Sequence, residues 1–211
     1  LALAAVPASA QVRATALPAQ PLLESTRDGQ DLNFDLVFDN PGNKALTLVR
    51  LEATWFDAQG GFLGQRRLDQ NGDDTTMGIA TVPNRALPAG GRLVVFNPFQ
   101  HFRAPMWLGD LRYSAVFSTG EKDASEQRIE MRLAPTTFVP RTSLGLPVRG
   151  ASFLHDGHDL TSHHRRLDIT GGMTTHFGIT ANFMRYAHDF CVTDDQGRLF
   201  RTDGATPEDW Y

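Results

Sequence analysis

An alternation of apolar and polar residues constrains the fold of this chain most strongly. Between residues 32 and 38 every even-numbered side chain is large and apolar, at Leu32, Phe34, Leu36 and Phe38. Because successive side chains of a β-strand point to opposite faces of the sheet, this period of two predicts a strand with one buried face. The same reasoning predicts strands at 45–56, 92–96, 111–117 and 127–133. No long segment has the 3.6-residue period of an amphipathic helix.

The predicted strand at 45–56 changes phase in its middle. Apolar residues occupy even positions up to Leu48 and odd positions from Leu51 to Trp55. A β-bulge adds one residue to a strand and thereby moves every later side chain to the opposite face. We therefore predict a bulge near Val49.

The spacing of these strands, separated by Gly, Pro and Asn turns, predicts an antiparallel, Ig-like β-sandwich over residues 31–135. Residues 11–30 are rich in Pro, Ala, Gln and Ser without a sustained period, which predicts a flexible lead-in. A proline-punctuated stretch at 136–150 predicts an extended linker, followed by a second domain at 151–211. The predicted fold class is mainly β.

Residues 1–10 have the pattern that ends a secretory signal peptide. The apolar run Leu1–Val6 precedes Pro7-Ala8-Ser9-Ala10, which supplies the small Ala-x-Ala residues that a signal peptidase accepts. We expect cleavage after Ala10, with export to the periplasm or cell envelope. The apolar run is too short to span a bilayer, so no membrane span is expected. An alanine-rich tail is the alternative interpretation.

The charge balance argues against a nucleic-acid partner. The chain has 20 basic and 24 acidic residues and a formal net charge of -4, without the basic surplus of a polyanion-binding protein. Cys191 is the only cysteine, so an internal disulfide is impossible. The sequence leaves the oligomeric state open.

Six of the seven histidines lie between His155 and His188, interleaved with acidic residues. Imidazole is the commonest metal ligand and the usual proton carrier near neutral pH, so this crowding points to a chemical site. The polar clusters are Asp156–Asp159, Ser162–Arg166 and Arg185–Phe190. Two alternatives need no chemistry: residues 163–166 form a solvated basic loop, or their arginines pair with nearby aspartates.

In order and spacing, these clusters resemble the start of M23-type (lysostaphin/LytM-like) zinc peptidase domains of exported bacterial proteins. In a divergent branch of that family a Ser-x-His-Arg-Arg element, here Ser162–Arg166, precedes an Arg-(Tyr/Phe)-Ala-x-Asp-(Phe/Trp) strand, here Arg185–Phe190. The resemblance covers about residues 145–211. It implies the incomplete start of a β-rich peptidase domain, with Zn²⁺ as cofactor and peptidoglycan or envelope peptides as substrate.

The resemblance also implies zinc ligands. Family members hold zinc through a His and an Asp of an early His-x-x-x-Asp element and through a later His-x-His, with water in the fourth position. Asp189 occupies the position of the aspartate, but Arg185 stands where the first histidine is expected. His164 is the best substitute, followed by His176 and His188. On a strand, His188 would point away from Asp189.

The remaining motif residues, Ser162, Arg165, Arg166 and Arg185, support the resemblance, and no catalytic residue is assigned among them. No His-x-His occurs in the 211 residues, so we expect this chain to be the N-terminal part of an exported peptidase and to be inactive by itself. The alternative is a non-catalytic envelope module, in which the sandwich binds a partner and the histidine region is structural. Gly171-Gly172 predicts a hairpin between strands near 165–170 and 173–180.

Overall fold

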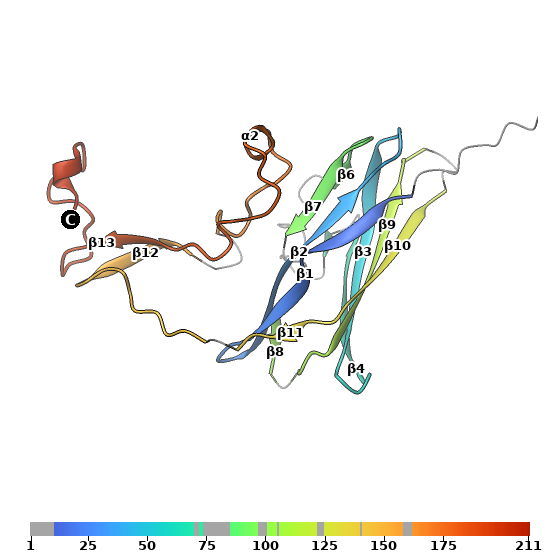
Figure 1. Cartoon of the computed structure of the whole chain (residues 1–211), viewed down its shortest axis with the longest axis horizontal. Helices are drawn as coiled ribbons and strands as arrows, with labels where there is room; N and C mark the ends of the chain where they lie inside the picture. The colour runs from blue at the N-terminus through green and yellow to red at the C-terminus, as the bar shows by residue number, and fades with distance from the viewer. Residues whose placement is uncertain are drawn as a thin grey trace, which may run out of the picture. The chain divides into compact units, whose positions relative to one another are not determined.

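A computed structural model describes residues 11–69, 72–73, 85–96, 101–104, 106–121, 125–139, 141–157 and 162–211. The chain divides into two compact units, Leu1–Val139 and Pro140–Tyr211. Figure 1 shows the first unit as a stack of long strands and the second as mostly irregular chain with one short strand pair. Residues 1–10, on which the export prediction rests, lie outside the described residues.

The first unit is built from two sheets. The first sheet contains β1 (Arg13–Ser25), β2 (Gly29–Asp39), β7 (Arg92–Phe96), β8 (His101–Arg103) and β11 (Thr136–Thr137). Its order is β11-β1-β2-β7, with β8 also paired to β2. Among these pairings only that of β1 with β11 is parallel.

The second sheet contains β3 (Leu46–Phe56), β4 (Phe62–Asp69), β5 (Gly72–Asp73), β6 (Ala86–Leu87), β9 (Asp110–Ser118) and β10 (Gln127–Leu133). Its order is β10-β9-β3-β4-β5, with β6 also paired to β3, and its described pairings are antiparallel. The predicted fold class, mainly β with antiparallel sheets, is confirmed.

The core lies between these sheets and consists of the side chains that the alternation placed inward. The even-numbered residues of 32–38 on β2 and the odd-numbered residues of 111–117 on β9 are fully buried. Three edge-on aromatic pairs join the two sheets: Phe34 with Tyr113, Phe38 with Phe117, and Trp55 with Phe102, at centroid distances of 5.9, 5.1 and 5.4 Å. This geometry is favourable for rings beyond the area they bury.

The predicted bulge on β3 is confirmed. The pairing of β3 with β9 shifts register between Leu48 and Arg50, so Val49 is the inserted residue. Leu48 before the shift and Leu51 after it are both buried in the same core. The extra residue therefore keeps both halves of β3 facing the same apolar layer, as the change of phase required.

The predicted flexible lead-in at 11–30 is wrong. Most of it forms β1, which pairs with β2 from Arg13 opposite Asp39 to Ser25 opposite Gln30, with an irregularity between Leu17 and Leu22. Prolines in that irregular stretch cannot donate to a ladder, so the pairing is interrupted there. Backbone pairing with a strong neighbouring strand, rather than alternation, orders β1.

The start of the predicted linker at 136–150 also belongs to the first unit. Leu22 and Leu23 of β1 pair with Thr136 and Thr137 of β11, and the Phe138 amide donates to the Leu23 carbonyl. The two units separate between Val139 and Pro140, inside the predicted linker range.

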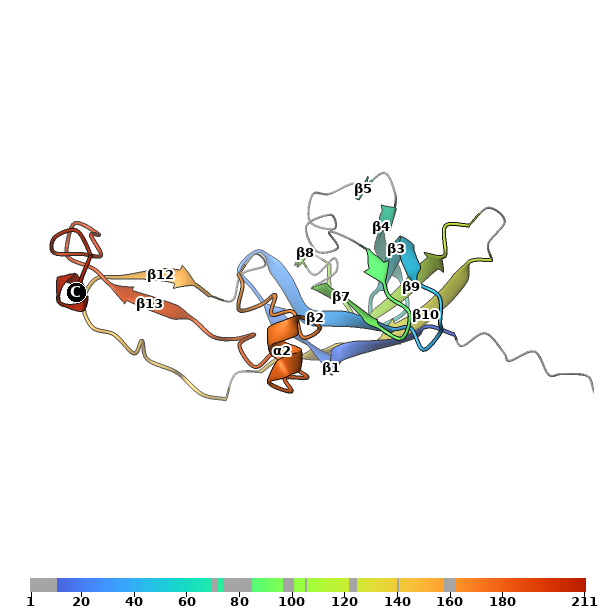
Figure 2. The ribbon, with the colours of Figure 1, turned by 90° about the horizontal axis from the view of Figure 1, so that it is seen from above.

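The second unit contains little regular structure. Its strands are β12 (Ser152–Asp156) and β13 (Asp189–Val192), which pair antiparallel and lie side by side in Figure 2. Its helices are α2 (Gly172–His176) and the 3₁₀ turn η1 (Pro207–Asp209). Residues 183–186 form a turn, so the predicted strand at 185–190 is wrong before Asp189.

The predicted hairpin at Gly171-Gly172 is wrong as well, because α2 begins there. The Thr174 hydroxyl contacts the carbonyl oxygens of Asp168 and Gly171 at 2.7 and 2.9 Å. The Asp168 carboxylate in turn accepts from the amide of Thr170 at 2.8 Å. Such short-range bonds from side chain to backbone compete with strand pairing and favour turns and helix starts.

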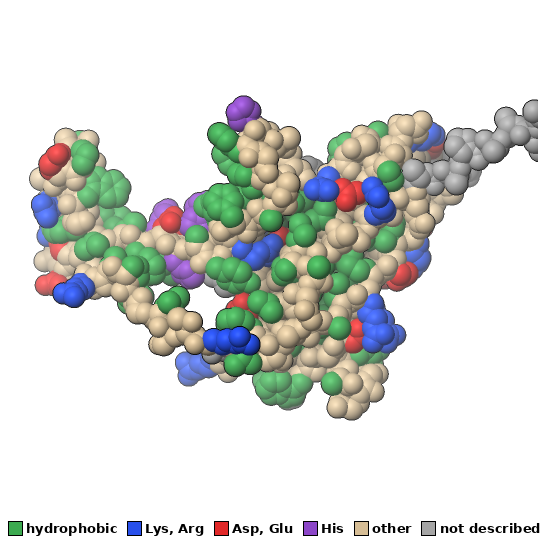
Figure 3. All heavy atoms as spheres, viewed as in Figure 1, with side chains coloured by type: hydrophobic (Ala, Val, Ile, Leu, Met, Phe, Trp, Pro, Cys, Tyr) green, Lys and Arg blue, Asp and Glu red, His purple; other side chains and the backbone are tan. Residues whose placement is uncertain are grey.

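Apolar burial contributes little to the second unit. Ile169 is its only buried hydrophobic residue in the part of the chain that the structure describes. Large apolar side chains are exposed instead; they include Leu144, Leu146, Phe153, Met173, Phe177 and Phe183. Figure 3 shows hydrophobic side chains on the surface of this unit. Polar contacts therefore carry much of the order in this unit.

The loop around Asp194 is ordered by polar contacts of this kind. Its carboxylate accepts from the backbone amides of Gln196 and Arg198, both at 2.9 Å, and from the Arg198 guanidinium at 2.7 Å. The contact with the Arg198 amide contributes most to lowering the pKa of Asp194 below its ordinary value.

No helix among the described residues has the length and apolar character that a membrane crossing requires.

We expect Phe34→Ala to lower the free energy of unfolding of the first unit by about 3–5 kcal/mol, the cost of removing a buried aromatic ring. Phe34 is 0% exposed and packs against Tyr113. Phe62→Ala is the matched control, because Phe62 is 63% exposed, and it should cost about 1 kcal/mol or less. Urea titration followed by circular dichroism measures both; equal losses would contradict the described core.

We expect the Asp194 loop to lose stability in acid. Because the folded pKa is lowered, the stabilising effect is complete above the unfolded pKa of about 3.9 and is lost as the pH falls through the folded value. An NMR titration of the Gln196 and Arg198 amides should show this midpoint below about 3.9. Asp194→Asn should remove the transition, and a midpoint at or above that value would contradict the prediction.

Candidate metal centre

Two aspartates lie opposite each other in the backbone pairing of β12 and β13. Asp156 and Asp189 are register partners, next to an irregularity between Leu154 and Asp156. Like charges in directly opposed positions destabilise a strand pair. Each carboxylate is matched by one of two consecutive histidines: Asp156 contacts His163, and Asp189 contacts His164. The arrangement brings four potential metal-ligating side chains to one end of the small sheet.

The His164 ring has the orientation of a metal ligand. It is only 3% exposed. Its Nδ1 lies 3.3 Å from the carbonyl oxygen of Ala187 and its Nε2 lies 3.4 Å from Asp189 Oδ2. Because a carbonyl only accepts, Nδ1 carries a proton, and in the neutral imidazole that a metal requires the lone pair lies on Nε2, the nitrogen that faces Asp189. Metal-bound histidines are held by the same kind of hydrogen bond from their second nitrogen.

The 3.4 Å separation of His164 Nε2 and Asp189 Oδ2 suits an ion between them. Donor atoms about 2.0–2.1 Å from a tetrahedral zinc ion are roughly 3.3–3.4 Å apart. Imidazole nitrogen and carboxylate oxygen are also donors that zinc accepts. By distance and by donor chemistry, this pair fits zinc.

The backbone of His164 is fixed on both sides. Its amide donates to Ser162 Oγ at 3.1 Å, and its carbonyl accepts from Asn182 Nδ2 at 2.8 Å. Asn182 Nδ2 also donates to the Arg165 carbonyl at 3.0 Å, and Asn182 Oδ1 accepts from the Met184 amide at 3.0 Å. These contacts lock the Ser162–Arg166 turn to the chain that leads into β13.

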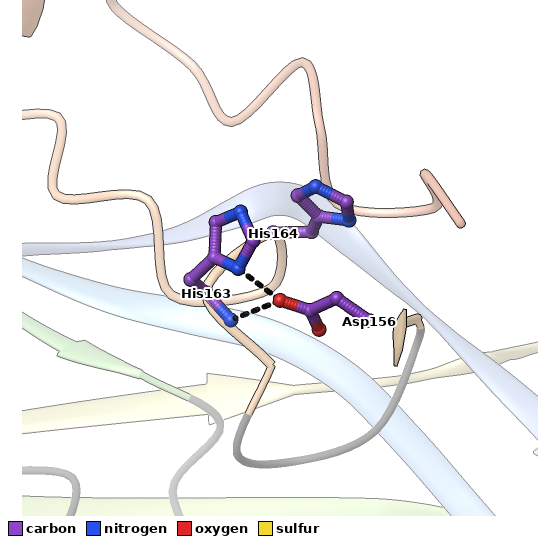
Figure 4. A group of neighbouring side chains, drawn as sticks. All are labelled: Asp156, His163 and His164. Atoms are coloured by element: carbon purple, nitrogen blue, oxygen red, sulfur yellow. Dashed lines mark hydrogen bonds and ion pairs between the residues drawn. The ribbon is translucent and has the colours of Figure 1, made fainter. Parts of the chain in front are cut away.

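Asp156 organises the other side of the turn. Its Oδ1 accepts from the Gly157 amide at 2.9 Å, and its Oδ2 contacts both the amide of His163, at 3.3 Å, and the ring Nδ1 of His163 (Figure 4). The Ser162 hydroxyl donates to the same carboxylate and is the main reason why the pKa of Asp156 lies below its ordinary value. The Gly157 amide and His163 lower this pKa further.

One donor atom from each of Asp156, His163 and His164 lies within 4.8 Å of the other two. The rings of His163 and His164 are 4.2 Å apart between centroids. Figure 4 shows the two rings next to each other, with the His163 ring in contact with Asp156. Within the described ranges this is the group of side chains with the spacing of a metal site. Asp189 is not part of this group and contacts it through His164.

The predicted site residues divide into two sets. His164 and Asp189 come together, and Ser162 supports them through the His164 amide. His176 and His188 lie outside the cluster. His176 is exposed on α2 and touches Phe177 edge-on, whereas His188 is exposed, with Nδ1 3.1 Å from the Tyr186 carbonyl. His188 precedes β13, so the argument from strand alternation does not apply to it.

The interpretation of residues 163–166 as a solvated basic loop is wrong for its central residues. His164 and Arg165 are buried, Arg166 is half-buried, and Arg185 is buried as well. Solvated loop residues would remain exposed, whereas the hydrogen bonds of Ser162 and Asn182 draw this turn inward. His158 and Asp159 lie outside the described residues.

Sequence reasoning missed Asp156 and Asn182 as parts of the site and did not list His163 as a ligand. The adjacent pair His163-His164 was the available signal for Asp156 and His163, because two neighbouring imidazoles each need a hydrogen-bonding or ionic partner. Asn182 gives a weaker signal: its contact with the amide two residues later is typical of an Asx turn. Its bonds to the carbonyls of residues 164 and 165 span too much chain to be predicted from spacing.

Comparisons with known proteins assign no family. No family model matches this chain, and no curated protein matches it. Among solved structures, the chain is similar to a GH20 exo-β-N-acetylglucosaminidase from Vibrio harveyi in complex with N-acetylglucosamine. The identity is 14% and the TM-score 0.24, over 70% of this chain and 25% of the enzyme's chain. This likeness is too weak to bear on fold or function, and the chain spans about a quarter of that enzyme's length.

We expect Ser162→Ala to loosen the turn that carries His164. The substitution removes the acceptor of a buried amide, which costs about 1–3 kcal/mol, so amide exchange at His164 should become roughly tenfold faster or more. Ser162→Thr keeps the hydroxyl and should preserve protection, and Thr180→Ala, at an exposed position, is the control. Exchange measured by NMR that is unchanged in Ser162→Ala would contradict this role.

Proposed function

We propose that this chain belongs to an exported, zinc-dependent peptidase of the M23 type, which hydrolyses peptide bonds of peptidoglycan or related envelope peptides. The observation that carries the proposal is the contact between His164 Nε2 and Asp189 Oδ2, 3.4 Å apart although the two residues are 25 positions apart in the sequence. His164 belongs to the Ser-x-His-Arg-Arg element and Asp189 to the Arg-Tyr-Ala-x-Asp-Phe element. Their proximity supports a shared metal role for these two motifs.

Arg185 supports the choice of His164 as the first ligand. It occupies the position four residues before Asp189 where the family places a histidine, and a guanidinium is a cation without a lone pair to offer. His164 supplies the imidazole from another segment instead, with Nδ1 held by the Ala187 carbonyl. The site thus keeps a His and an Asp while drawing the histidine from a different part of the chain.

The residues of this chain prepare the site for hydrolysis. His164 and Asp189 would hold the zinc, which lowers the pKa of a bound water and polarises a peptide carbonyl when it is present. Burial of His164 and its fixed ring limit the reorganisation that binding requires. The signal-peptide pattern at residues 1–10 supports a substrate in the cell envelope.

A second candidate is a non-catalytic envelope module. The contrast between the two units favours it: the sandwich has a continuous apolar core, whereas among the described residues of the second unit Ile169 is the only buried hydrophobic side chain. The sequence also lacks a His-x-His pair within its 211 residues. In that function the sandwich binds a partner and the histidine cluster holds no metal.

We expect Asp189→Ala and His164→Gln each to weaken zinc binding at least about 10–100-fold, because losing a ligand should cost no less than losing a group that supports one. His176→Gln is the matched control, since His176 is exposed in the same unit and lies outside the cluster. Competition with a chromophoric chelator measures the affinities of the 211-residue chain. Affinities equal to that of His176→Gln would support the non-catalytic module.

Peptidase activity is tested on the gene product extended past Tyr211. If the reading frame supplies a His-x-His pair, the purified protein should release amino groups from peptidoglycan, and Asp189→Ala should abolish that release. A reading frame without such a pair, or release that persists in Asp189→Ala, would overturn the peptidase proposal.

A further inference from the structure

We propose that His163 is a third metal ligand and that Asp156 is the carboxylate that orients it. His163, His164 and Asp189 then form a three-ligand site contained within this chain. The inference rests on the proposed function, because it extends the zinc site of His164 and Asp189. With three ligands of its own, the site needs no further histidine from a later His-x-His to bind its ion.

The orientation of the His163 ring is the first argument. Its Nδ1 contacts Asp156 Oδ2, and the same carboxylate oxygen lies 3.3 Å from its backbone amide. An ionised carboxylate only accepts, so Nδ1 carries the proton and the lone pair resides on Nε2. His164 is held in the same way, with Nδ1 on a backbone carbonyl. Carboxylate–histidine–metal arrangements use this geometry.

Proximity to His164 is the second argument. The two ring centroids are 4.2 Å apart, and one ligand nitrogen of each histidine lies within 4.8 Å of the other. Rings this close can each provide a ligand nitrogen to the same ion, since donors around a tetrahedral zinc are roughly 3.3–3.4 Å apart. The His163 side chain is 65% exposed, so an ion in solution can reach its ring.

The contacts of Asp156 explain why it is a positioning residue rather than a ligand. A carboxylate has about four lone-pair sites. Those of Asp156 accept from the Gly157 amide, the His163 amide, the His163 ring and the Ser162 hydroxyl. Three of these four donors belong to the Ser162–Arg166 turn that presents the two histidines. Asp189 is different, because its side chain is about half exposed and faces His164 Nε2.

The consequence is a site with an open position. Three protein ligands and one free position are typical of catalytic zinc sites, whereas structural zinc sites have four protein ligands. Exposure of His163 leaves the ligand set accessible to water and to a peptide. We therefore expect the 211-residue chain alone to bind one zinc ion.

The test uses the 211-residue chain, titrated with zinc against a chromophoric chelator and with Co²⁺ followed by visible absorption. His163→Gln should weaken zinc binding at least about 100-fold and change the Co²⁺ spectrum, because a ligand is lost. Asp156→Asn should weaken zinc binding about 10–100-fold, the cost of losing a group that supports a ligand, and leave the saturated Co²⁺ spectrum unchanged. His176→Gln should match the wild type. Circular dichroism confirms that each variant is folded.

Added imidazole provides a second measurement. His163→Ala leaves an exposed gap in the ligand set, so millimolar imidazole should restore the wild-type Co²⁺ spectrum. The same addition to His164→Ala should fail, because His164 is buried.

The outcomes separate the two proposals. If His163→Gln and His176→Gln bind zinc alike while Asp189→Ala binds it weakly, the third ligand is overturned and the zinc site of the proposed function stands. If His164→Gln and Asp189→Ala also match His176→Gln, both proposals fall. A changed Co²⁺ spectrum in Asp156→Asn would make Asp156 itself a ligand and overturn its positioning role.

Discussion

The candidate metal centre depends on one backbone pairing, that of β12 with β13. This pairing sets Asp156 opposite Asp189 and so creates a local concentration of negative charge that needs compensation. The turn from Ser162 to Arg166 places two adjacent histidines beside these aspartates, one in contact with each carboxylate. A bound divalent cation would relieve the same repulsion, which is why a metal role and the local stability of the strand pair are linked.

The two units achieve order by different physical means. In the first, edge-on aromatic pairs such as Phe34 with Tyr113 fill the space between two sheets, and apolar burial dominates. In the second, hydrogen bonds from Asn182, Asp156 and Asp194 fix turns that bury little apolar surface. A unit of this kind gains much from an ion that binds only its folded state, so metal binding and folding should be coupled.

The sandwich was largely predictable because its signal is local. Side-chain alternation located β2, β3 and β9, and the change of phase after Leu48 located the bulge. Alternation could not find β1, whose order comes from backbone bonds to β2 and whose prolines break the pattern. It also failed at Gly171-Gly172, where the bonds of Thr174 to nearby carbonyls favour a helical turn over a hairpin.

For the metal centre, the sequence by itself determined the kinds of donor available and narrowed the ligands to His164 and Asp189, with His176 and His188 as alternatives. Only the tertiary structure showed which of these candidates lie together: it placed His164 beside Asp189, left His176 and His188 outside the cluster, and introduced Asp156, His163 and Asn182. The reason is physical. Residue type fixes which atoms can bind a metal, but the distance between atoms far apart in the chain depends on how the turns and the strand pair close, which no local pattern records.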